Sequence, residues 1–193
     1  MINLPESIIL DHSPYKHFFG QYHISDQLYT NIINWFKNDA PWKLVKEDFY
    51  TQYEFSLLDT ATPSFLDFIK SPTYLEELKR FIEGVYEVNL ISKFNIVAHK
   101  LTKGHVIKIH NDYLDDISIR ESHRLLLHFN RDWMEKDGGY CMVFSNEDSN
   151  SICQIVEPSK FLLQSFAISK VSYHAVSEVR DGERFTIIFT FYQ

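Results

Sequence analysis

The segment KIHNDY, residues 108–113, places a histidine and an aspartate two positions apart. The flanking stretch alternates apolar and polar residues like the end of a strand, where residues i and i+2 point to the same side. His110 and Asp112 are therefore candidates to hold a ligand together. The spacing is weak evidence, because a chain of this composition contains about one such pair by chance. Taken alone, the pair is best interpreted as a surface salt bridge.

A third candidate, His174, lies much later in the chain, in the otherwise apolar segment SYHAV. For a lone histidine, the simpler interpretation is a core or rim imidazole that is hydrogen-bonded to a backbone carbonyl. Together with His110 and Asp112, however, it completes a set of two neutral imidazoles and one carboxylate. This set occupies one face of a metal in non-haem Fe(II) oxygenases and leaves adjacent positions open.

The segment RFTIIFTFY, residues 184–192, adds an arginine to these candidates. Its near-continuous apolar run indicates a strand buried on both faces, with Arg184 and Thr186 on one face. A buried guanidinium keeps its charge and needs an anion, best a carboxylate bound through two hydrogen bonds. The alternative is that Arg184 reaches out to water or pairs with Glu183 or Asp181. If it shares a cavity with the three ligands, the site fits a keto acid with a distal carboxylate, namely 2-oxoglutarate.

Two amphipathic helices are predicted in the first half of the chain. Residues 71–84 contain Ser71 at a capping position, Pro72 at the first helical position and Gly84 as the stop. Residues 24–36 form the other helix, with its apolar side chains on one face: Leu28, Ile32, Trp35 and Phe36.

Strands dominate the rest of the sequence. One is expected at 49–59, and after residue 85 many short strands follow at close spacing without an intervening helix. This pattern indicates a mainly β fold with flanking helices, an antiparallel sandwich or jelly roll covered on one face by an N-terminal helical layer. The predicted strands of the second half are 89–101, 105–110, 123–129, 139–144, 151–156, 160–166, 171–176 and 184–192.

Composition limits the class of protein. A chain of 193 residues that is 45% hydrophobic predicts one domain with a sizeable core, in which 1–90 support the site and 91–193 contain it. The net charge of −7 and the lack of basic clusters argue against nucleic acid and anionic membrane as partners. No signal peptide or apolar span of ~20 residues is evident. Cys141 and Cys153 are expected to be reduced thiols, and the location to be cytoplasmic.

From about residue 95 to the end, the sequence resembles the prolyl-4-hydroxylase-like Fe(II)/2-oxoglutarate-dependent dioxygenases. An HxD pair, a distal histidine and an arginine ten residues later, in that order, form a specific combination. The matching segments are GHVIKIHND, LLLHFNRDWMEKDGGYCMVF, EPSKFLLQSF followed by YHAV, and RFTIIFTFY as the closing strand.

The resemblance implies a double-stranded β-helix, or jelly-roll, core that uses Fe(II), 2-oxoglutarate and O2. His110, Asp112 and His174 would ligate the iron. Arg184 would bind the far carboxylate of 2-oxoglutarate, and Thr186 would add a hydrogen bond. Related halogenases have Gly or Ala in place of the aspartate so that chloride can bind, and Asp112 therefore implies hydroxylation of a C–H bond, with decarboxylation of 2-oxoglutarate to succinate.

Several positions depart from the family pattern or have two interpretations. Family members often place a tyrosine on the distal carboxylate where His128 stands here. We expect His128 to donate the same bond, and the alternative is an ordinary half-buried histidine. A second tyrosine, nine residues before the first metal ligand, is replaced by Leu101. We interpret Gly138 and Gly139 as backbone room at a turn, and Trp133 as core packing rather than a substrate platform.

The substrate is weakly specified. The compact chain favours an amino acid or another small metabolite, with a peptidyl residue close behind. Gln52 and Glu54 are candidate polar contacts. The loop after the HxD pair is either a lid over the site or, more commonly, a solvated loop. Its candidate residues are Tyr113, Asp115, Asp116, Arg120 and Arg124.

Two other classes of protein remain open. One is a cupin-like enzyme that uses a divalent metal for isomerisation or hydrolysis and has no need of a buried Arg184. The other is a non-catalytic jelly-roll binding protein in which the histidines are incidental.

Overall fold

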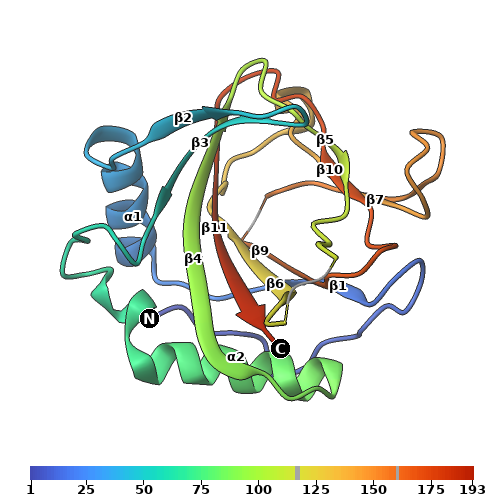
Figure 1. The fold of residues 1–193 in the computed structure, drawn as a ribbon. Helices are drawn as coiled ribbons and strands as arrows, with labels where there is room; N and C mark the ends of the chain where they lie inside the picture. Colours follow the sequence, from blue (N-terminus) through green and yellow to red (C-terminus); the bar gives the residue numbers. More distant parts are fainter. Residues whose placement is uncertain (116–117, 160) are drawn as a thin grey trace.

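A computed structural model describes residues 1–115, 118–159 and 161–193. The described residues form two antiparallel sheets flanked by helices (Figure 1), which confirms the predicted mainly β fold with a jelly-roll core. The larger sheet has the order β1 (His17–Gln21), β9 (Leu162–Ala167), β6 (Glu121–His128), β11 (Glu183–Tyr192), β4 (Ile91–Thr102), β3 (Thr51–Ser56) and β2 (Lys43–Lys46). The smaller sheet has the order β5 (Ile107–His110), β10 (His174–Val176), β7 (Cys141–Phe144) and β8 (Ile152–Val156).

Helices α1 (Asp26–Asn38) and α2 (Pro72–Tyr86) pack on the outer face of the larger sheet, and their buried side chains share one apolar cluster with β11. Both begin at serine caps, because the hydroxyl of Ser25 accepts from a backbone N–H of α1 at 3.3 Å and that of Ser71 does the same for α2 at 3.3 Å. Two short 3-10 helices cover Asp67–Lys70 and Glu135–Asp137.

Strand β11 is central to the larger sheet and is buried on both faces, as its composition predicts. One set of alternating side chains enters the helical core, where the ring of Phe185 lies 5.3 Å from that of Phe36. The other set faces the space between the sheets, and it includes Arg184, Thr186 and Ile188. Because side chains alternate along β11, one set packs in the hydrophobic core and the other set lines the cavity.

Three details differ from the sequence predictions. Helix α2 continues past Gly84 to Tyr86, because the Tyr86 side chain is buried and its hydroxyl donates to Ser165 at 3.0 Å. Strands β1 and β2 were not predicted, since both are short and lie at the edges of the larger sheet. Strand β6 begins at Glu121, two residues before the predicted start, so Arg124 lies inside the strand although it was also named with the preceding loop.

The hydrophobic core contains side chains from both halves of the chain. Leu78 of α2 and Ile96 of β4, for example, are both fully buried in the same cluster. No helix in the described residues has the length and apolarity needed to cross a bilayer.

We predict that Leu78→Ala lowers the free energy of unfolding by about 2–5 kcal/mol, because it leaves a cavity where the helix meets the sheet. Urea denaturation followed by circular dichroism measures this change. Leu58→Ala is the matched control, since Leu58 is 41% exposed and its truncation costs at most about 0.5 kcal/mol. Equal losses in the two variants would contradict the assigned packing.

Candidate metal centre and active site

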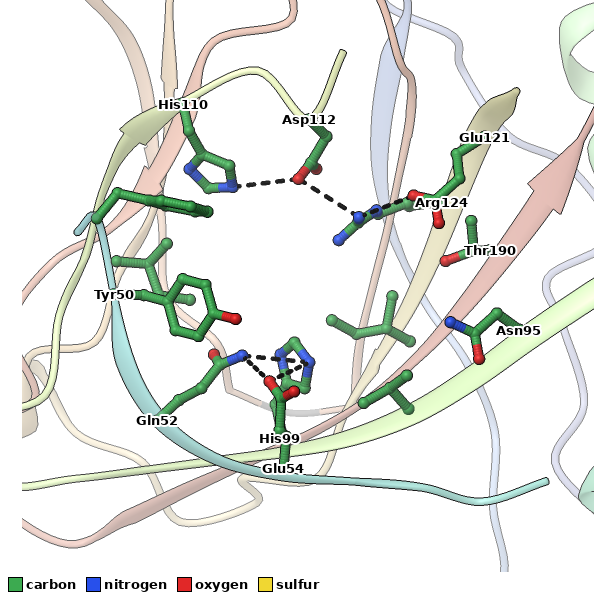
Figure 2. Close-up of a pocket in the computed structure, with 14 residues that line it drawn as sticks. Tyr50, Gln52, Glu54, Asn95, His99, His110, Asp112, Glu121, Arg124 and Thr190 are labelled. Carbon is green, nitrogen blue, oxygen red and sulfur yellow. Dashed lines mark hydrogen bonds and ion pairs between the residues drawn. The ribbon is translucent and has the colours of Figure 1, made fainter. Parts of the chain in front are cut away.

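Strand pairing brings the two histidines together. His110 ends β5, His174 begins β10, and the two residues are directly opposed in the antiparallel ladder, with ring centroids 4.3 Å apart. Asp112 follows two residues after β5 (Figure 2), and its carboxylate lies 3.5 Å from His110 Nε2 and 3.3 Å from His174 Nε2. One potential ligand atom from each residue lies within 4.8 Å of the others.

The outer ring nitrogens set the orientation of both imidazoles. His110 Nδ1 lies 2.9 Å from the carbonyl of Lys108, and His174 Nδ1 lies 2.8 Å from the carbonyl of Ser172. Because a carbonyl only accepts, each Nδ1 holds the proton and each Nε2 presents a lone pair. Asp112 Oδ2 is buried and has no hydrogen-bond donor among the described residues. Three electron-rich atoms thus converge, an arrangement that fits a bound cation and is repulsive without one.

The backbone around Asp112 is held in an unusual conformation. Its φ of +60° is in the left-handed region, which aspartate tolerates better than most residues. Asn111 braces the turn, because its side chain donates to the carbonyl of Lys170 at 3.1 Å and accepts from the backbone N–H of Tyr113 at 3.1 Å. The Ser172 hydroxyl donates to the Asn111 carbonyl at 3.0 Å. These contacts tie the Asp112 turn to the chain that precedes His174.

Arg124 supplies a positive charge next to the carboxylate. Its Nη2 lies 3.4 Å from Asp112 Oδ1 and 3.1 Å from Glu121. Burial alone raises the pKa of Asp112, but the Arg124 guanidinium opposes burial and holds that pKa well below its usual range. Burial, followed by the neighbouring His110, lowers the pKa of His174. The site therefore contains a carboxylate and a neutral imidazole, the protonation states that a metal ion requires.

Arg184 lies between the sheets and is only 3% exposed. Its Nε donates to the carbonyl of Gly139 at 3.0 Å, and Nη1 donates to Thr186 Oγ1 at 3.2 Å. Among the described residues no carboxylate pairs with it, since Glu183 lies 3.6 Å from Lys100 instead. A guanidinium buried without an anion is costly, so this arrangement favours an anionic ligand.

The two glycines before β7 make room for Arg184. A side chain at Gly139, which has a φ of +65°, would come within 3.1 Å of Arg184 Cδ. A side chain at Gly138, with a φ of +71°, would meet the Glu178 carbonyl at 2.2 Å. Both positions therefore need glycine, in agreement with the sequence prediction. Trp133 packs at the same turn, where its Nε1 donates to the Gly138 carbonyl at 2.8 Å, and it does not line the metal site.

His128 and Thr186 lie next to this guanidinium. His128 Nδ1 is 3.3 Å from Thr186 Oγ1 and 3.5 Å from Arg184 Nη2, and its Nε2 is 3.3 Å from Gln164 Oε1. Burial and then Arg184 lower the pKa of His128 well below its usual range. A narrow cavity of about 50 Å³ connects this group with the metal site, lined among others by His99, Arg124, Cys141, Gln164, His174, Arg184 and Thr186.

The sequence analysis did not predict the roles of two residues. Arg124 lies within the predicted strand 123–129 but was considered only as part of a possible lid, whereas in β6 its side chain reaches Asp112. His99 lies two residues before Leu101 on the same face of β4 and lines the cavity, whereas Leu101 is fully buried. Side-chain alternation in β4 places His99 on the same face as Leu101, and this alternation is the sequence signal that could have identified His99.

The loop after the HxD pair contributes no residue beyond Asp112 to the metal centre within the described residues. Asp115 pairs with Lys170 at 2.8 Å, and Arg120 Nη1 donates to the Tyr113 hydroxyl at 3.1 Å. Asp116 lies outside the described residues. The possible role of this loop as a lid stays a prediction.

Comparisons with known proteins agree with this geometry. Residues 96–191 match the model of the 2OG-Fe(II) oxygenase superfamily. A Pseudomonas putida prolyl-4-hydroxylase is similar in structure, with a TM-score of 0.73 and 18% identity over 92% of each chain. A viral collagen prolyl hydroxylase from Paramecium bursaria Chlorella virus-1, in complex with 2OG, has a TM-score of 0.62 and 15% identity over 91% of this chain and 95% of that one. No curated protein sequence matches significantly.

The matched segment, residues 96–191, belongs to the 2OG-Fe(II) oxygenase superfamily, and the resemblance seen in the sequence is confirmed. The similar solved structures are prolyl-4-hydroxylase-like members of that class. Enzymes of the family use Fe(II), 2-oxoglutarate and O2.

We predict that His99 makes the stability of the metal-free protein fall in acid. Burial, followed by Arg124 and Arg184, lowers the pKa of His99 from 6.5 to about 3. Below pH 6.5 the unfolded chain therefore binds a proton that the folded protein excludes. Relative to His99→Gln, the wild-type free energy of unfolding should fall by about 1.4 kcal/mol per pH unit between about pH 6 and 4.

Urea titrations at several pH values in EDTA measure this difference. His12→Gln is the control, because it makes the same chemical change at an exposed site. A His99→Gln curve that also runs parallel to wild type would show that His99 is not kept neutral by the fold.

Proposed function

We propose that this protein is an Fe(II)- and 2-oxoglutarate-dependent dioxygenase that hydroxylates an unactivated C–H bond. The observation that supports this most is the pairing of two features in adjoining cavities. His110, Asp112 and His174 present three unprotonated ligand atoms to one point, and Arg184 is buried nearby without a carboxylate partner.

In this proposal each group has a defined role. His110, Asp112 and His174 hold Fe(II) through Nε2, a carboxylate oxygen and Nε2, while the Lys108 and Ser172 carbonyls keep both imidazoles in the binding tautomer. When bound, Fe(II) and 2-oxoglutarate supply the oxidation, in which O2 and the keto acid yield succinate, CO2 and one oxygen atom for the substrate C–H bond.

Arg184 binds the distal carboxylate of 2-oxoglutarate, and the Thr186 hydroxyl adds a hydrogen bond. His128 Nδ1 faces Arg184 Nη2, which can only donate, so neutral His128 accepts there and orients the guanidinium instead of donating to the carboxylate. The carboxylate would neutralise the buried charge of the Arg184 guanidinium. Its binding would therefore offset the desolvation cost of keeping that guanidinium buried without an anion. A cupin-like hydrolase or isomerase would not explain the buried guanidinium of Arg184. A non-catalytic jelly roll would not explain the converging lone pairs of the three ligand residues. The proposed oxygenase uses both.

We also propose that residues 1–193 act as one domain, with 1–90 supporting the core in 91–193. The shared apolar cluster supports this assignment. A small molecule or a peptidyl residue is the substrate class, and a cytoplasmic location is part of the same proposal.

The test is anaerobic addition of Fe(II) and then 2-oxoglutarate. We expect a weak visible charge-transfer band only when both are present. Asp112→Ala should abolish it by removing one ligand. Arg184→Ala should raise the dissociation constant of 2-oxoglutarate roughly 10- to 100-fold, because a charge-assisted contact of about 1.5–3 kcal/mol is lost.

Arg80→Ala is the control for loss of a guanidinium, since the Arg80 side chain is 75% exposed on α2. In air, the wild type should convert 2-oxoglutarate to succinate slowly even without a substrate. A folded wild-type protein that gives neither the band nor succinate would rule out this function.

A further inference from the structure

A second cavity, of about 230 Å³, adjoins the metal centre on the side of β3 and β4 (Figure 2). His110 and Asp112 line it, so any molecule inside it lies next to the proposed iron site. Most of the residues that line it are polar or charged. Besides the two metal-site residues, the polar residues that matter here are Tyr50, Gln52, Glu54, His99, Glu121 and Arg124.

One wall offers a hydrogen-bond donor with positive charge. Arg124 uses Nη2 for both Asp112 and Glu121, and Figure 2 shows its other terminal nitrogen directed into the cavity. Within the described ranges, no acceptor is bonded to that nitrogen, Nη1. The Tyr192 hydroxyl donates to Glu121 at 3.3 Å and helps to keep Glu121 beside the guanidinium. Arg124 is therefore free to bind one carboxylate of a ligand.

The opposite wall offers a carboxylate without a cation. Glu54 accepts from Gln52 Nε2 at 2.6 Å, and its nearest basic group is His99 Nε2 at 3.8 Å. Gln52 Nε2 also lies 3.4 Å from His99 Nε2, a contact that requires His99 Nε2 to be unprotonated. Among the described residues, no lysine or arginine pairs with Glu54. Gln52 is 3% exposed and its Oε1 has no donor, so the wall is rich in acceptors.

The charges on the two walls are complementary to a dipolar ion. Arg124 keeps an unbonded donor at Nη1 although its Nη2 pairs with Asp112 and Glu121, and Glu54 on the opposite wall has no lysine or arginine partner among the described residues. Tyr50 and Gln52 lie beside Glu54 in Figure 2, so a cationic nitrogen would find several acceptors there. The volume is below the roughly 300–1,000 Å³ of cavities that bind drug-sized molecules. A ligand of amino-acid size fits these limits.

We infer that this cavity binds the hydroxylation substrate and that the substrate is a small zwitterion of the free α-amino acid class. Its ammonium group pairs with Glu54, and its carboxylate binds Arg124 Nη1. The substrate C–H bond then lies beside His110 and Asp112. This inference rests on the proposed oxygenase function and narrows its substrate.

A peptidyl residue is the competing occupant. A groove of about 560 Å³ adjoins the cavity through Glu54, Asn95 and Val97 and has room for neighbouring residues. A residue inside a peptide, however, has neither a free ammonium nor a free carboxylate for the two walls, and it would leave Glu54 without a cation. Blocking these groups one at a time therefore separates the two occupants.

The first test uses the wild-type protein with Fe(II), 2-oxoglutarate and air. Each of the twenty protein L-amino acids is added separately, and succinate is measured. We expect at least one to accelerate succinate formation above the substrate-free rate, and its N-acetyl and carboxamide derivatives to fail. Acceleration by the blocked forms, by peptides alone, or by no amino acid would overturn the inference.

These outcomes are distinct from failure of the proposed function. If only the substrate inference is wrong, the charge-transfer band and the slow substrate-free turnover remain. If the oxygenase function is wrong, both are absent from the folded protein.

The second test is Glu54→Gln, chosen because Arg124 also contacts Asp112 whereas Glu54 touches no metal-site residue. Loss of the charge pair should raise the KM for the stimulating amino acid roughly 10- to 100-fold, with a smaller effect on kcat. Glu147→Gln makes the same chemical change at an exposed site and should leave KM unchanged. An unchanged KM in Glu54→Gln would overturn the inference, and the wild-type panel decides the question if this variant does not fold.

Discussion

The alternation of side chains along β11 is the constraint on which the rest of the structure depends. One face of this strand places Phe185 and its apolar neighbours against the helices, and the other face holds Arg184 and Thr186 between the sheets. A shift of one residue would exchange these faces, placing a guanidinium in the helical core and phenylalanines in the cavity. The energy of core packing therefore fixes the position of the buried charge.

The candidate metal centre on the smaller sheet depends on strand pairing. Direct pairing of His110 with His174 sets the distance between the imidazoles, and two backbone carbonyls set their tautomers. Asp112 reaches them from a left-handed turn that is braced from both sides. A bound cation would relieve the repulsion between the lone pairs that converge here.

Two arginines line the space between the sheets. Arg184 lines the narrow cavity, and Arg124 lines both this cavity and the wider one beside β3. Both arginines lie in the segment that matches the superfamily model. The opposing wall of the wider cavity, with Gln52 and Glu54, comes from the N-terminal half of the chain. In the proposed function, the segment that matches the family would bind the co-substrate, and β3, near the edge of the larger sheet, would contribute to substrate binding.

The sequence by itself determined the strand-rich class, the two capped helices and the identity of the HxD, His174 and Arg184 candidates. Those features depend on local periodicity and on residue chemistry, which are visible in short segments. Tertiary structure alone decided that α2 extends past Gly84, that Arg124 reaches Asp112, and that Glu54 faces Arg124 across a cavity. These features depend on strand register and on packing between segments that lie far apart in the chain. There, the free energy of burying Tyr86 or of pairing a carboxylate outweighs the local conformational preference of the sequence. No short segment contains that information.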